Sequence, residues 1–236
     1  MRWAISGLVL AMLAAPALKL LSRKGEAAER QVGAFLLLLG AGLALRLAAI
    51  GEQSIAIAAN TIGHALLSLA GVPLLRFTRA VFRPDEAWAR WLERVGIAVT
   101  FAALPAMWLD GGFANESARS LLLVNGSRML ACAWSFWEAL RYRGLMLRRA
   151  AHGLADATLV NRFTLWSIWM GVLTVTFAFV LAVRLHGAAE GADGSQLAAM
   201  VRVVRPALVV SLAIAMVALQ LTFFPPRSYL RWVARA

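Results

Sequence analysis

The chain alternates long apolar stretches with short polar segments. The stretches run roughly over residues 3–21, 32–51, 54–75, 93–110, 118–140, 162–184 and 197–224. Each is close to the about 20 apolar residues that a helix needs to cross a hydrocarbon core about 30 Å thick. The pattern therefore predicts an all-α membrane protein, in which residues 1–236 form a single domain, a bundle of seven transmembrane helices.

The basic residues fall into alternate gaps between these stretches. The second, fourth and sixth gaps, over residues 51–54, 110–117 and 185–196, contain acids and no basic residue. The other gaps and the C-terminal tail are rich in arginine: Arg23 and Arg30; Arg76, Arg79, Arg83, Arg90 and Arg94; Arg141, Arg143, Arg148, Arg149 and Arg162; Arg227, Arg231 and Arg235. Because basic residues mark the cytoplasmic side of spanning helices, we expect the N-terminus outside and the C-terminus in the cytoplasm.

One alternative concerns the first stretch. Arg2, the apolar run after it and the small-residue sequence Ala15-Pro16-Ala17 are also features of a cleaved signal peptide. Cleavage would leave six helices and would place the basic residues that follow, among them Lys19 and Arg30, outside. Every later loop would then violate the charge rule, so the seven-helix interpretation is favoured.

The composition supports a membrane protein and limits the classes of partner that we expect for it. Hydrophobic residues make up 61% of the chain, and its formal net charge is +12. All basic residues except Lys19 and Lys24 are arginines, which together with abundant alanine and glycine is typical of a GC-rich bacterial genome. We therefore expect a multi-pass protein of the bacterial cytoplasmic membrane. The positive charge is explained by the lipid bilayer, so nucleic acid is not an expected partner.

The third gap contains the signals of a helix start at the membrane surface. Pro84 followed by Asp85 and Glu86 is typical of the first turn of a helix. The spacing of Glu86 and Arg90 further predicts an ion pair on this interfacial helix, which leads into the fourth span.

The C-terminal tail has the pattern of a short basic amphipathic helix. Pro225-Pro226 ends the last span, and Arg227, Arg231 and Arg235 then recur every four residues beside apolar neighbours. We expect this basic tail to lie on anionic lipid headgroups at the cytoplasmic face, with docking to a partner protein as the alternative.

Polar residues inside the predicted spans are the candidate functional site. Asn60 and His64 lie one helical turn apart, and Asn125 and Arg128 lie three residues apart in another span. Ionisable groups at membrane depth are costly, so they usually face the interior of a bundle and mark function. With Arg46, these residues predict a polar pocket, open to the outside, for a small anion or carboxylate. Arg202, Arg205 and Asp110 belong to the same half of the bundle.

Structural roles compete with this interpretation. Arg46, Arg202 and Arg205 lie close enough to helix ends to reach the headgroups, and Asp110 has the charge to form a structural ion pair with one of them. Arg128, about nine residues from either end of its stretch, is the hardest to explain in this way. Glu138 and Gln220 are expected to tie helices together, with Arg141 as the partner of Glu138.

Several chemistries are absent from the sequence. No lysine follows Lys24, so a retinal Schiff base in a late span is excluded. The single Cys132 excludes a CxxC motif, and nucleotide-binding GxxxxGK[ST], zinc-binding HExxH and esterase GxSxG motifs are absent. We expect no cofactor, no metal site and no enzymatic activity.

Three segments at helix borders resemble a family of proteins. They are Val81-Phe82-Arg83-Pro84 with Trp88-Ala89, Gly153-Leu154-Ala155-Asp156 with Asn161-Arg162-Phe163 and Trp166, and Phe224-Pro225-Pro226. The chain resembles, in these segments, uncharacterised bacterial membrane proteins with seven transmembrane helices. The resemblance implies a shared architecture and no activity.

The leading functional hypothesis is a non-enzymatic sensor or ligand-binding protein, with a pocket for a small anion and an arginine-rich cytoplasmic face. An accessory or scaffold subunit of a larger membrane complex is the second hypothesis, in which the intramembrane polar groups pair with other membrane subunits. A small-solute transporter is the third, although no inverted repeat is recognisable in the sequence.

Overall fold

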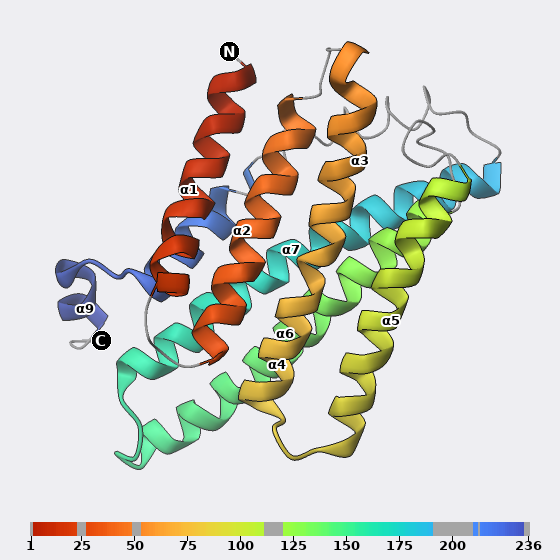
Figure 1. Cartoon of the computed structure of the whole chain (residues 1–236). Coiled ribbons are helices and arrows are strands. Elements are labelled where there is room, and N and C mark those ends of the chain that lie inside the picture. The colour runs from red at the N-terminus through yellow and green to blue at the C-terminus, as the bar shows by residue number, and fades with distance from the viewer. Residues whose placement is uncertain are drawn as a thin grey trace.

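The protein is an all-helical bundle throughout the part that the structure describes. The computed structural model describes residues 2–22, 27–48, 53–110, 120–190, 210–211 and 213–233. The elements are α1 (Arg2–Ser22), α2 (Ala27–Ala48), α3 (Gln53–Leu69), α4 (Gly71–Phe82), α5 (Ala87–Leu109), α6 (Ser120–Ala151), α7 (Ala157–Glu190) and α9 (Arg227–Val233), with a further apolar helix over Ala213–Phe223 (Figure 1). The predicted all-α class is confirmed for these residues.

Four helices among the described residues are long and apolar enough to cross a membrane. They cover Ala27–Ala48, Ile57–Phe82, Ala87–Leu109 and Ala157–Gly187. Two apolar helices, Ser6–Ser22 and Ala213–Phe223, are shorter. The long helix α6 is outside both groups and carries several polar and charged residues in its apolar half. These features are compatible with a multi-pass membrane protein.

The helices extend beyond the apolar stretches that predicted them. The stretch 54–75 continues as helix to Phe82, the stretch 118–140 to Ala151, and the stretch 162–184 begins at Ala157 and continues to Glu190. Hydropathy detects only the apolar part of a helix, whereas backbone hydrogen bonding continues into polar sequence. For the last stretch, residues 197–209 lie outside the described part of the chain.

The third apolar stretch is divided at Ala70, where α3 ends and α4 begins. Pro73 lies in the first turn of α4, and it has no N–H to donate to the carbonyl of Leu69. Proline is tolerated in a first turn, which is why the chain restarts as helix at Gly71.

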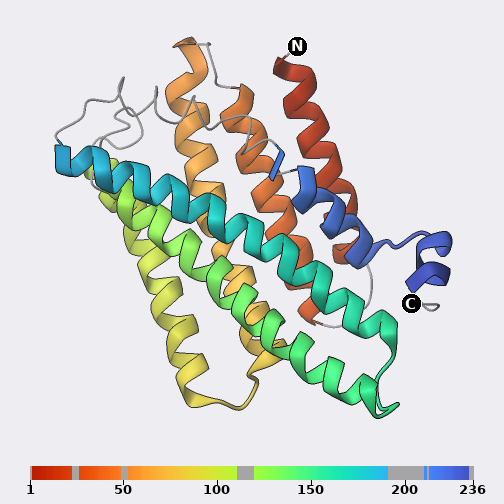
Figure 2. The ribbon, with the colours of Figure 1, turned by 180° about the vertical axis from the view of Figure 1, so that it is seen from behind.

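The bundle has an upright group of helices and an oblique pair. α1, α2 and α3 stand side by side, and α6 and α7 pack along each other and cross behind them at a slant (Figures 1 and 2). α4 continues downward from α3 and packs against α2, α5 and α6. α6 is therefore in contact with helices from both groups.

Aromatic side chains fill the centre of the bundle. Trp169 of α7 is 1% exposed, and its ring centroid lies 5.5 Å from that of Phe35 on α2 and 5.1 Å from that of Trp166. The indole Nε1 of Trp166 donates to Ser135 Oγ of α6 at 3.1 Å. The hydrogen bond satisfies the polar atom of a buried indole and holds α6 and α7 in register.

The connections at residues 83–86 and 152–156 lie at one end of the bundle, together with the start of α2 (Figure 1). We call this the arginine-rich end. The start of α1, the end of α2 and the end of α5 lie at the opposite end (Figure 1).

Candidate functional site

Arg128 is the centre of a buried polar cluster between α6 and α3. It lies about 12 Å along α6 from Ser120, by the rise of about 1.5 Å per residue, and is 3% exposed. Its Nη2 donates to the backbone oxygen of His64 at 2.8 Å and to Ser68 Oγ at 2.9 Å, and lies 3.3 Å from His64 Nδ1. Because His64 and Ser68 are one helical turn apart on α3, a single guanidinium reaches both.

Asn125 adds a fourth neutral group from one turn earlier on α6. Its Nδ2 donates to the backbone oxygen of Leu121 at 2.8 Å, which turns Oδ1 toward Arg128. The separation from Oδ1 to Arg128 Nη1 is 3.5 Å, beyond the usual range of an N–H···O hydrogen bond. Asn125 therefore interacts with the Arg128 guanidinium mainly through the dipole of its amide and not through a strong hydrogen bond.

Two more arginines place their charges near His64. Arg46 comes from the last turn of α2 and Arg184 from the second half of α7, and both are half-buried. Together with Arg128, they act electrostatically on the imidazole of His64. Four helices thus deliver three cations and a histidine to one region, which we call the arginine cluster (Arg46, His64, Arg128 and Arg184).

Close contact between α2 and α3 helps to bring Arg46 to this region. A Cβ atom built on Gly63 would lie 2.6 Å from Cγ of Arg46 and 3.0 Å from the backbone oxygen of Gly42. A Cβ on Gly42 would lie 2.9 Å from the backbone oxygen of Gly63. The two glycines permit the approach that larger residues would block.

The structure brings His64, Asn125 and Arg128 into one cluster and places Arg46 beside it. Asn60, the remaining predicted site residue, is half-buried one turn from His64 and is not among the groups bonded to Arg128. Arg202 and Arg205 lie outside the described residues.

Sequence reasoning missed Arg184 and Ser68. Arg184 stands at the end of an apolar stretch, where it was interpreted as the border of a loop. The extension of α7 to Glu190 places it inside a helix instead. Ser68 lies four residues after His64, and this i, i+4 spacing was the available signal.

The cluster has the electrostatic character of an anion site. The described hydrogen-bond partners of Arg128 are all neutral, and its Nε is buried without a hydrogen-bond partner. Burying a cation without a counter-charge is costly, so such a group attracts an anion or a carboxylate. The guanidinium offers donors in a fixed planar geometry that matches a carboxylate.

A second group of charged residues lies at the arginine-rich end, and the arginines of this group form ion pairs with glutamates. Arg83, in the connection between α4 and α5, donates from Nε to Glu138 Oε1 at 2.8 Å, and Glu138 of α6 is fully buried. Arg141, the predicted partner of Glu138, is within 3.6 Å of its Oε2. Arg79 of α4 also pairs with Glu93 of α5. We call this set the paired end (Arg79, Arg83, Glu86, Glu93 and Glu138).

Glu86 differs from its predicted role. Its carboxylate pairs with Arg83 and accepts a hydrogen bond from Trp88 Nε1, whereas Arg90 donates to the backbone oxygen of Asp85. The predicted pairing of Glu86 with Arg90 is therefore not the one observed. Helix α5 begins at Ala87, with Glu86 as its N-cap, so Pro84 lies in the turn before the helix. Hydrogen bonds from Arg83 and Trp88 lower the pKa of Glu86.

Two other polar residues tie helices together. The carboxylate of Asp110 accepts from the backbone N–H of Ser120 at 2.8 Å and from its hydroxyl at 2.7 Å, and so caps the start of α6. Gln220 donates to the backbone oxygen of Met12 at 3.1 Å, which joins the last described apolar helix to α1 as expected.

The C-terminal tail forms the short helix α9. Tyr229 and Asn161 of α7 exchange hydrogen bonds of 2.9 and 3.1 Å, and Val233 is buried. Arg227 and Arg231 are exposed, and Arg235 lies outside the described residues. α9 is thus anchored to α7 while its described arginines remain accessible.

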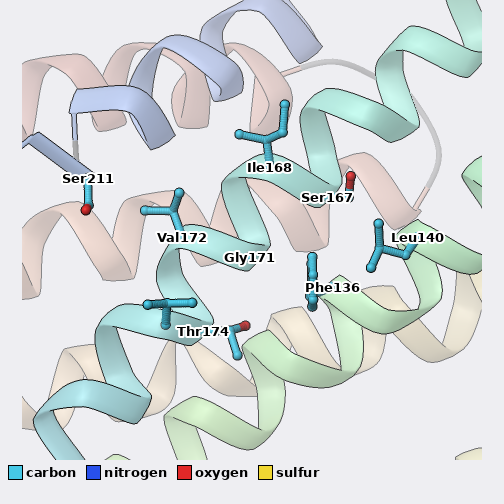
Figure 3. A pocket seen from close by; sticks show the side chains of 9 residues that line it. Phe136, Leu140, Ser167, Ile168, Gly171, Val172, Thr174 and Ser211 are labelled. Carbon is cyan, nitrogen blue, oxygen red and sulfur yellow. The ribbon is translucent and has the colours of Figure 1, made fainter.

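One apolar cavity lies apart from the arginine cluster, and none of its lining residues belongs to that cluster. It has a volume of about 450 Å³ between α6, α7 and Ser211, and its walls include Phe136, Gly171 and Val172 (Figure 3). Ile168 and Val175 on its rim are 42% and 69% exposed, so it is open toward the side of the bundle. It therefore forms a lateral groove.

No group of three histidine, cysteine, aspartate or glutamate side chains within the described ranges has the arrangement of a metal site.

Comparisons with protein-family models, curated proteins and solved structures give no match to this chain.

Proposed function

We propose that this protein is a non-enzymatic, multi-pass membrane sensor that binds a small anionic ligand at the arginine cluster. The observation that carries the proposal is the burial of Arg128 among neutral partners, with Nε left without a hydrogen bond. A permanently charged guanidinium at this depth is an expensive group to keep for packing alone. A bound carboxylate or other small anion would supply the counter-charge that the described partners of Arg128 do not.

The proposed membrane arrangement has seven spans, with the N-terminus outside and the arginine-rich end in the cytoplasm of a bacterium. The shared position of the connections at 83–86 and 152–156 supports it (Figure 1). Exposed arginines follow each connection, including Arg90 and Arg162. The basic-residue rule for short loops then orients the bundle.

This orientation puts the arginine cluster in the outer half of the membrane. Arg46 and Arg184 are half-buried, whereas Arg128 is buried and donates hydrogen bonds to His64 and Ser68 of α3. We propose that an incoming anion contacts Arg46 and Arg184 first and is held by the field of Arg128. Asn60, one turn nearer the outer end of α3, would lie along the entry side.

The proposed output is at the cytoplasmic face. α9 would rest on anionic headgroups through Arg227 and Arg231, each worth about 1 kcal/mol near such a surface. Its hydrogen bonds with Asn161 connect it to α7, the helix that also carries Arg184. A shift of α7 on ligand binding would therefore reach the tail.

The second candidate is an accessory subunit of a larger membrane complex, and the lateral groove of Figure 3 favours it. An open apolar groove between two helices is a shape that a partner's helix can fill. Arg128 would not form that contact, because it does not line the groove and is only 3% exposed.

The test of the anion site is ligand binding to purified protein. A panel of small carboxylates, phosphate and sulfate is added to the detergent-solubilised protein, and its thermal stability is measured. An anion at one hundred times its dissociation constant stabilises the folded state by about 2.7 kcal/mol. We expect such a shift for the parent and for Arg94→Leu, an exposed arginine on α5, and no shift for Arg128→Leu. If Arg128→Leu bound the anion as well as the parent does, the proposed anion site would be wrong.

Gentle purification from native membranes, followed by mass spectrometry of proteins and small molecules, separates the two candidates. A lone chain carrying an anion supports the sensor. A stoichiometric partner protein supports the subunit.

A further inference from the structure

A smaller cavity at the arginine-rich end combines opposite charges with aromatic walls. It has a volume of about 240 Å³ and is lined by residues of α2, α4, α7 and the helix Ala213–Phe223. Glu29 from the first turn of α2 and Arg162 from the second turn of α7 are its charged lining residues. It lies far along the bundle from the arginine cluster, so the proposed anion site does not account for it.

Aromatic side chains form the walls beside the charged groups. Phe77 of α4 and Phe223 lie against Trp166, with ring centroids 4.9 and 5.7 Å from that of the indole. Leu159, Arg162 and Trp166 follow one face of α7 at spacings of three and four residues, so Arg162 has an apolar side chain about one turn away on either side. The cavity is therefore amphipathic along α7.

These features match the chemistry of a lipid headgroup region. A guanidinium binds a phosphate diester through charge-assisted hydrogen bonds, and a carboxylate accepts hydrogen bonds from a primary ammonium. The aromatic walls suit the glycerol and the first methylenes of an acyl chain, and an exposed arginine at a helix end lies at headgroup level. Glu29 gives the site a preference that arginine alone would not, because its carboxylate pairs with a headgroup ammonium and not with a neutral headgroup alcohol.

We propose that this cavity binds the headgroup of a phospholipid that carries a primary ammonium, phosphatidylethanolamine, with the phosphate on Arg162 and the ammonium at Glu29. The volume holds the headgroup and the start of one chain, while the rest of the lipid lies in the bilayer. The bound lipid would bridge α2, α4 and α7.

The test is native mass spectrometry of the full-length protein, delipidated in detergent. Phosphatidylethanolamine, phosphatidylcholine and phosphatidylglycerol with identical chains are added at equal concentrations. We expect a single bound phosphatidylethanolamine and at least about fivefold lower occupancy for the other two, because one lacks N–H donors and the other lacks the ammonium. Equal occupancy of all three lipids would overturn the proposal. So would tight binding of free phosphoethanolamine, which would show that the ligand is a soluble phosphoester.

Substitutions of Arg162 and Glu29 test which residue binds the phosphate and which binds the ammonium of the headgroup. Arg162→Gln should lower binding of every lipid about tenfold, the loss expected for one charge-assisted hydrogen bond, and Arg162→Lys should restore much of it. Glu29→Gln should remove the preference for phosphatidylethanolamine over phosphatidylglycerol. Arg149→Gln, an exposed arginine of α6 at the same end, is the matched control and should bind as the parent does. Unchanged lipid preference in Glu29→Gln, or unchanged lipid affinity in Arg162→Gln, would contradict the site.

Discussion

Arg83 and Arg128 are both largely buried, yet their surroundings differ in kind. Arg83 lies between two carboxylates, Glu86 and Glu138, at the end of the bundle. Arg128 lies deeper and meets a backbone oxygen, a hydroxyl and neutral side chains. The first arrangement balances its own charge, and the second leaves a positive potential. Under the proposed function, Arg83 is a structural arginine at the paired end and Arg128 is the ligand-binding arginine of the arginine cluster.

The largest expected effect comes from breaking the paired end. In Glu138→Leu, Arg83 loses its buried partner, and removing one member of a buried ion pair typically costs about 3–5 kcal/mol. Because Arg83 keeps Glu86, we expect a loss near the lower limit, about 3 kcal/mol in the free energy of unfolding. Unfolding of the protein in denaturing detergent measures it.

Glu190→Gln is the control for that experiment. Glu190 pairs with His186 at 3.3 Å, but both side chains are more than half exposed. Its loss should change stability by less than about 1 kcal/mol. If Glu138→Leu were no less stable than this control, the structural role of the paired end would be wrong.

Arg128→Leu should affect stability less and ligand binding more. The substitution removes the buried charge and leaves Ser68 Oγ without its donor, at a cost of about 1–3 kcal/mol. Since the cost of burying an uncompensated cation disappears as well, the bundle should remain folded. Circular dichroism and size-exclusion chromatography check folding beside the anion titration. An unfolded Arg128→Leu would place this arginine among the structural residues instead.

Gly42→Ala should disturb the arginine cluster and spare the paired end. The added Cβ would meet Leu67 Cγ at 2.7 Å and the backbone oxygen of Gly63 at 2.9 Å, so α2 must move from α3. Such overpacking costs about 1–3 kcal/mol and would shift Arg46 with its helix. Stability and anion affinity should both fall.

Gly126→Ala provides the matched glycine substitution. A Cβ on Gly126 has nothing within 4 Å, and alanine favours helix by about 1 kcal/mol over glycine. This variant should be at least as stable as the parent. Loss of anion affinity in Gly126→Ala but not in Gly42→Ala would contradict the role given to the α2–α3 contact.

The smallest effect is a pH dependence at the paired end. Hydrogen bonds from Arg83 and Trp88 lower the pKa of Glu86 from its ordinary value of 4.5. Their stabilisation is present above that ordinary value and is lost as the pH falls through the lowered pKa of the folded protein. Fluorescence of Trp88, compared between the parent and a Trp88→Phe variant, should change in this acidic range. The change should disappear in Glu86→Gln, and its persistence there would assign it to another group.

Periodicity and charge predicted much of this molecule, but not the ends of its helices. The apolar stretches located the helices, and the pairs Asn60 with His64 and Asn125 with Arg128 were recognisable from their spacing. Arg184 was missed because hydropathy ends a helix where the sequence becomes polar, whereas α7 continues to Glu190. Glu86 was paired wrongly with Arg90, because i, i+4 spacing takes no account of Arg83 across the turn.

The sequence by itself determined the helical class, the apolar stretches and the alternation of arginine-rich gaps, since these depend on local hydrogen bonding and on transfer from water. Apart from Arg141 and Glu138, which lie three residues apart on α6, only the tertiary structure decided which arginines meet a carboxylate and which do not. The contact between Arg128 and α3 joins residues about sixty positions apart, and the approach of α2 to α3 depends on Gly42 facing Gly63. Such contacts are fixed by how helices pack, which no local pattern contains.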